Sequence, residues 1–142
     1  MKIVIISISV FLSVSCFAQE VKMGSFEKMY KVLDTLEWVL NFKSNDTIKC
    51  NFSIEYLSEN GWQEFNNDIF TKVDKTYNYF YFKGTGKHRF SKVIDFDIPD
   101  EVIVGQKKVR ICCNFQPMRY DPGTYFYKTS YSNSFMIASG PR

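Results

Sequence analysis

The sequence predicts an all-β protein, an antiparallel β-sandwich of seven or eight short strands. Apolar and polar residues alternate at 47–56 and 108–115, as they do in half-buried strands, because successive side chains point to opposite faces. Turn-forming residues separate such runs at 44–46, 59–61 and 121–123. No repeat, linker or low-complexity tract divides the chain. We therefore expect one sandwich domain over 35–142, preceded by a short segment at 19–34.

Residues 1–18 have the pattern of a signal peptide. Lys2 supplies the positive start, 3–12 form an apolar core, and 16–18 form a small-residue cleavage site. The apolar run is shorter than the roughly 20 residues that span a bilayer, so we expect cleavage before Gln19 rather than anchoring. The mature protein is then periplasmic or extracellular, with no transmembrane segment.

An alternative form of processing is lipid attachment at Cys16. Residues 12–16 resemble a bacterial lipobox, although Ser13 stands where such motifs usually carry leucine. A single acyl chain holds a protein only marginally at a membrane. Both forms of processing place the domain outside the cytoplasm.

The charge balance argues against a nucleic-acid partner. Cleavage leaves 124 residues with 17 basic and 15 acidic side chains, a surplus too small for binding to phosphate backbones. A basic cluster at 83–92 is followed at once by acidic residues at 95–101, which indicates a solvated surface of mixed charge.

The segment at 19–34 has two interpretations. Apolar residues recur at helical spacing from Phe26 to Leu33, which predicts a short amphipathic helix, while an edge strand at 30–33 is the alternative. In the sandwich domain, the pattern predicts strands at 36–43, 47–56, 62–65, 77–82, 90–98, 108–115, 124–129 and 134–137. We expect 83–87, with its two glycines, to be a loop.

Three cysteines remain after cleavage, in a compartment where disulfides persist. Cys50 and Cys113 both lie on the apolar faces of their strands, which predicts a disulfide between them. Cys112 then points outward as a free thiol. Two readings of Cys112 stay open: it links two chains or reacts with a partner, or it is an incidental free cysteine.

The order of Cys50, Trp62 and Cys113 is typical of an immunoglobulin-like sandwich, in which a disulfide joins the two sheets and a tryptophan packs on it. We therefore expect Trp62 to be buried near the disulfide, and the alternative is that Trp62 is an exposed platform for a ligand. The tight Asn60-Gly61 turn before it predicts a hairpin.

Three short motifs extend this assignment. The sequences SENGWQEF at 58–65, PGTYFY at 122–127 and YSNSFMI at 131–137 resemble small exported bacterial immunoglobulin-like domains of the Bacteroidetes type. The resemblance covers about 35–137 and implies a fold more than an activity. Ile111 stands where antibody-like domains would carry their corner tyrosine.

The sequence offers little for catalysis. His88 is the only histidine, so no Ser-His-Asp or Cys-His set is evident, and we expect neither an enzyme nor a bound metal or cofactor. The leading hypothesis is a non-catalytic binding or envelope-structural module that contacts another exported or envelope protein. An inhibitor or immunity protein for a secreted enzyme is one alternative, since loop recognition leaves no motif.

A second alternative is a carbohydrate-binding module. Tyr77, Tyr79 and Tyr81 share one face of an expected strand, and Tyr125 and Tyr127 lie near the last turns. Their rings could stack on a polysaccharide. The competing interpretation is that these aromatic side chains cover the core.

Overall fold

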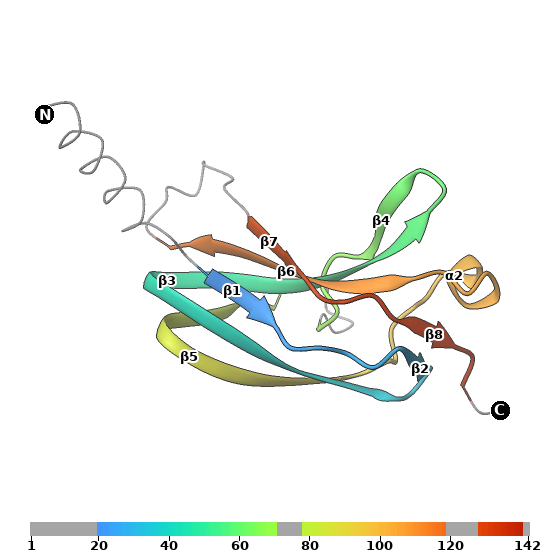
Figure 1. The fold of residues 1–142 in the computed structure, drawn as a ribbon, viewed down its shortest axis with the longest axis horizontal. Helices are drawn as coiled ribbons and strands as arrows, with labels where there is room; N and C mark the ends of the chain where they lie inside the picture. The colour runs from blue at the N-terminus through green and yellow to red at the C-terminus, as the bar shows by residue number, and fades with distance from the viewer. Residues whose placement is uncertain (1–19, 71–77, 119–127, 141–142) are drawn as a thin grey trace, which may run out of the picture.

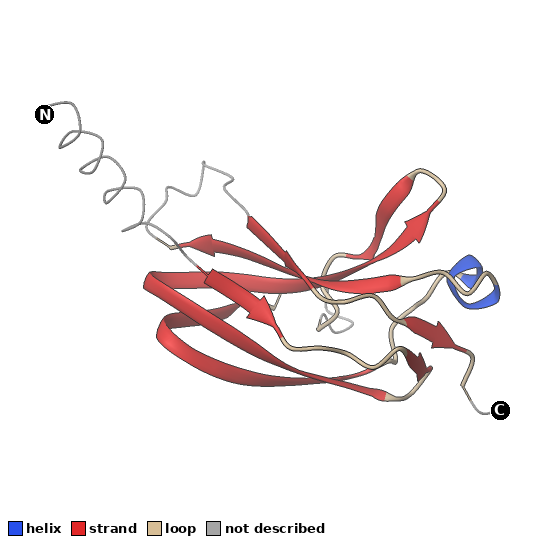
Figure 2. Cartoon of the chain, viewed as in Figure 1, coloured by secondary structure: helices blue, strands red, loops and turns tan. Residues whose placement is uncertain are grey.

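The computed structural model describes residues 20–70, 78–118 and 128–140. The strands are β1 (Glu20–Met23), β2 (Met29–Lys31), β3 (Thr35–Ser58), β4 (Gly61–Asn66), β5 (Phe80–Val93), β6 (Val109–Pro117), β7 (Lys128–Tyr131) and β8 (Met136–Ala138), and the helix is α2 (Asp100–Val104). Strands make up nearly all of the regular structure of these described residues (Figure 2). The expected signal peptide at 1–18 and the alternative lipid site at Cys16 lie outside the described residues.

The sheet is organised around β3, a strand of 24 residues. The first half of β3 pairs with β1 and with most of β5. The second half pairs with the start of β5, with β6 and with β4, while β7 joins on the far side of β6. All of these pairings are antiparallel, and they form one six-stranded sheet. β3 and β5 bend together, so that the sheet curls (Figure 1). β2 and β8 form a separate parallel pair.

The core fills the inside of this curl. Trp38, from the first half of β3, lies edge-on to Phe52 from the second half, with ring centroids 5.3 Å apart. Phe90 of β5 stacks on Trp38 at 5.5 Å and meets Phe52 at 4.7 Å. One strand therefore supplies two facing walls of the core, and the halves of the sheet are stabilised by burial of the same rings.

The antiparallel all-β prediction is confirmed. The predicted burial of alternate residues in the main strands is also confirmed, because Ile48, Phe52, Ile54 and Ile111 are all fully buried. The helical interpretation of 26–33 is wrong and the strand interpretation is the nearer one, since Met29–Lys31 forms β2.

Two predicted turns are wrong because β3 and β5 continue past them and pair on both sides of an irregularity. The residues at 44–46 lie inside β3, where the register shifts between Ser44 and Ile48 and the Ser44 hydroxyl bonds to the Asp46 backbone. The expected loop at 83–87 lies inside β5, where Gly84 has a φ of 82°. The irregularity at each place bends the strand without ending it.

The β3–β4 hairpin is confirmed, with Gly61 at a φ of 105°. Among the described residues, no helix has the length and apolar character needed to cross a lipid bilayer.

Candidate functional site

The outer face of the second half of the sheet carries a group of large polar and aromatic side chains. Pairing places Glu55 of β3 opposite Arg110 of β6, and Leu57 of β3 opposite Trp62 of β4. The next pair along β6 places Cys112 opposite Tyr131 of β7. Four strands therefore contribute neighbouring side chains to the face that points away from the core.

Arg110 is at the centre of this group. Its guanidinium carbon lies 4.1 Å from the centroid of the Trp62 ring and 3.8 Å from that of Tyr131. Its Nε donates a hydrogen bond of 2.5 Å to Glu55 Oε1, and its Nη2 forms an ion pair with the same oxygen. We call Glu55, Trp62, Arg110 and Tyr131 the arginine–aromatic cluster.

The cluster combines charges that are held by several contacts with rings that are partly exposed. Only 20% of the Arg110 side chain and 17% of the Glu55 side chain are exposed, so each charge is held in a fixed place by its partners. Tyr131 remains 51% exposed, and the neighbouring Leu57 37%. The face therefore offers a fixed guanidinium and ring surface to a partner without a large ordering cost.

The prediction that Trp62 is buried near a disulfide is wrong. Trp62 is half-buried on the outer face, against Arg110, and Trp38 is the buried tryptophan of the core. The hairpin signal correctly located the strand that carries Trp62. It did not determine which face of the sheet the ring occupies.

Cys112 lies on the outer face as expected, but it is not exposed. Only 2% of it is accessible, because Ser53 and Tyr131 are its cross-strand neighbours and the Glu55–Arg110 pair lies in the adjacent row. Burial, and then the nearby Glu55 charge, raises the pKa of the Cys112 thiol to about 12. A thiol in this position does not favour the linking or reactive role.

The expectation that a Cys50–Cys113 bridge joins two sheets is wrong, while the pairing of these two cysteines stays a prediction. Cys50 lies opposite Phe115 and Cys113 lies opposite Phe52, so the two cysteines are diagonal neighbours on adjacent strands of one sheet. The structure contains both as buried thiols. A hydrogen bond with Cys50, together with burial, raises the pKa of Cys113.

The expected tyrosine platform is described only in part. Tyr77, Tyr125 and Tyr127 lie outside the described residues. Tyr81 is 54% exposed on β5, while the ring of Tyr79 lies 3.8 Å from the ammonium nitrogen of Lys49.

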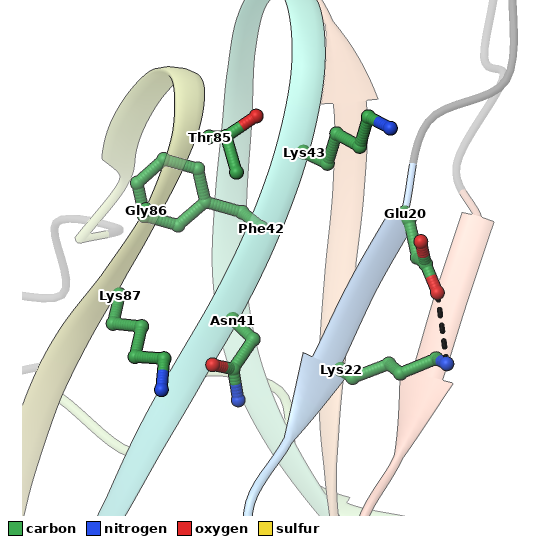
Figure 3. A pocket seen from close by; sticks show the side chains of 8 residues that line it. All are labelled: Glu20, Lys22, Asn41, Phe42, Lys43, Thr85, Gly86 and Lys87. Carbon is green, nitrogen blue, oxygen red and sulfur yellow. Dashed lines mark ion pairs between the residues drawn. The ribbon is translucent and has the colours of Figure 1, made fainter.

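A second surface feature is a shallow groove on the outer face of the first half of the sheet (Figure 3). Its volume is about 310 Å³. Its polar lining residues are Glu20 and Lys22 from β1, Asn41 and Lys43 from β3, and Thr85 and Lys87 from β5. The sequence indicated a basic cluster near Lys87 but not its meeting with β1 and β3, because that depends on strand register.

No protein-family model and no curated protein matches the chain. Among solved structures, the chain is similar to Spo0M, a sporulation control protein from Bacillus subtilis, with 14% sequence identity and a TM-score of 0.47. That similarity covers 87% of this chain and 51% of Spo0M, so the chain spans about half the length of that protein.

Proposed function

We propose that this protein is a non-catalytic exported binding module that contacts another exported or envelope protein through the arginine–aromatic cluster. The proposal includes a signal peptide at 1–18 and the finer fold assignment, an immunoglobulin-like sandwich of the bacterial type. The way in which the two halves of β3 face each other across one core supports that assignment.

The observation that carries the proposal is the stack of Trp62, Arg110 and Tyr131 on an outer sheet face. Tryptophan, tyrosine and arginine are the residues most enriched where protein interfaces concentrate their binding energy. Such residues contribute most when they are held in place before binding and surrounded by contacts that exclude water. The ion pair with Glu55 holds Arg110, and Arg110 in turn holds the two rings.

Affinity capture tests the proposal. Tagged mature protein is incubated with envelope extract and culture medium from the source organism, and the captured proteins are identified by mass spectrometry. We expect one protein to be enriched over an unrelated exported control, and a Tyr131→Ala variant to lose most of that enrichment.

Tyr81→Ala is the matched control, because Tyr81 and Tyr131 are tyrosines of nearly equal exposure on different strands. The control variant should retain the captured protein. Equal capture by wild type and Tyr131→Ala, or no protein enriched over the control, contradicts the proposal. Capture of a secreted enzyme whose activity falls on binding would make the module an inhibitor.

A further inference from the structure

We infer that the groove between β1, β3 and β5 binds an acidic polysaccharide, a chain of sugars that carry carboxylate or sulfate groups. The groove and the arginine–aromatic cluster are formed by different residues. An experiment can therefore contradict the binding role of one site and leave that of the other intact.

The register brings cations from three strands to one place. Asn41 of β3 pairs with Lys22 of β1 on one side and with Lys87 of β5 on the other, so the three side chains form one row across the sheet (Figure 3). Neighbouring strands are about 4.8 Å apart, so this row spans roughly 10 Å. Two residues further along β3, Lys43 lies in a parallel row between Glu20 of β1 and Thr85 of β5.

The groove is lined by three lysines and a single carboxylate, so its own charges leave a positive surplus. Glu20 forms an ion pair of 2.8 Å with Lys22, and this pair lowers the pKa of the Glu20 carboxyl. Within the described part of the chain, Lys43 and Lys87 form no ion pair, and both are exposed. Two ammonium groups on different strands are therefore available to anionic groups of a ligand, with Lys22 beside them.

The groove also provides neutral hydrogen-bonding groups between its cations. The Asn41 amide lies between Lys22 and Lys87, and the Thr85 hydroxyl lies beside Lys43. An acidic polysaccharide carries the complementary pattern, with acid groups separated by hydroxyl groups. The volume is at the small end of ligand sites, roughly 300 to 1,000 Å³, and suits one or two sugar rings of a longer chain.

The position of the groove favours a sugar chain over an acidic peptide. Extended peptides commonly bind by adding a strand to a sheet edge, where they gain main-chain hydrogen bonds. This groove instead lies over the face of three paired strands, where the ladders between β1 and β3 and between β3 and β5 already use the backbone groups beneath it. Side chains alone provide its recognition chemistry.

Affinity electrophoresis of the mature protein tests the inference. Gels contain polygalacturonate, dextran sulfate or neutral dextran at equal mass, which distinguishes carboxylate, sulfate and uncharged ligands. We expect retardation by at least one acidic polymer and none by neutral dextran. The effect should weaken in about 0.5 M salt, because screening shortens the reach of surface charges.

A Lys43→Gln/Lys87→Gln double variant should bind the acidic polymer about tenfold more weakly. The matched control is Lys107→Gln/Lys108→Gln, which removes the same charge between α2 and β6 and should bind as wild type does. Lys43→Arg/Lys87→Arg should retain binding, because it preserves the charge. Equal losses in the two Gln variants overturn the inference, as does the absence of retardation at low salt. Binding of polyglutamate as tight as that of the polysaccharide also overturns it.

Discussion

At Arg110, removal of the guanidinium would leave the half-buried Glu55 carboxylate without its partner. Arg110→Met should lower the free energy of unfolding by about 2 kcal/mol, because an uncompensated charge in a partly desolvated place is costly. A Glu55→Gln/Arg110→Met double variant removes that charge as well and should recover part of the loss. Urea unfolding of the three proteins measures the difference. If the double variant is no more stable than Arg110→Met, the ion pair does not stabilise the cluster.

The Cys112 thiol predicts a fall in stability at alkaline pH. Its pKa is raised from 9.0 to about 12 in the folded protein, so below pH 9 the thiol is protonated in both states and its contribution to stability is complete. Above pH 9 the unfolded thiol ionises first. Its contribution then falls by up to about 1.4 kcal/mol per pH unit until the pH passes the folded pKa.

A Cys112→Ala variant tests this slope. Urea unfolding in the presence of reductant, at pH values from about 8 to about 10, should show a shallower decline in the variant than in wild type. Cys113 also has a raised pKa, so some decline remains in both proteins. Parallel slopes would show that Cys112 is not protected from ionisation by folding.

The sequence predicted which side chains lie on the outer face, but not the burial or the contacts of each one. The alternation in 108–115 correctly placed Cys112 and Arg110 on the face away from the core. Alternation says nothing about what covers that face, so the burial of Cys112 was missed. The contacts of Arg110 with Trp62 and Tyr131 depend on pairings between distant segments, for which no local signal exists.

At the scale of elements, the β3–β4 hairpin depends on Gly61. Its φ of 105° is a conformation that residues with a Cβ adopt only under strain. Gly61→Ala should therefore lower the free energy of unfolding by about 1 to 2 kcal/mol. Gly24→Ala is the control, since Gly24 has no positive φ and an added Cβ would make ordinary contacts of 3.6 Å with the Val39 carbonyl oxygen.

Urea unfolding of both glycine variants makes the comparison. Gly24→Ala should change stability by less than about 1 kcal/mol, because it also reduces the freedom of the unfolded chain. Equal effects at the two positions would mean that the turn conformation of Gly61 contributes nothing specific.

The positions of the strands were predicted more accurately than the residues at which the strands end. The hydrophobic pattern identified the segments of β3 and β6, because burial on one face imposes a period of two residues. Glycines and short polar runs at 44–46 and 83–87 suggested turns, yet β3 and β5 pair with each other before and after the register shift that lies there. Cross-strand hydrogen bonds can override a local turn signal, and the local sequence does not indicate which strands pair.

At the scale of the whole molecule, β3 and β5 run through both halves of the curled sheet. The two halves share one core, because rings such as Trp38 and Phe52 from opposite halves of β3 pack on each other. A domain built in this way should unfold as one cooperative unit.

The two tryptophans provide a direct measurement of this cooperativity, since the chain has only Trp38 and Trp62. Trp62→Phe leaves Trp38 to report on the shared core, and Trp38→Phe leaves Trp62 to report on the outer face of β4. In each variant, the urea midpoint measured by fluorescence should coincide with that measured by far-ultraviolet circular dichroism. If the Trp62 signal changes at lower urea than the circular dichroism of the same variant, the hairpin opens before the sheet. The arginine–aromatic cluster would then lose the fixed arrangement on which its proposed binding role depends, because Trp62 is one of the two rings that contact Arg110.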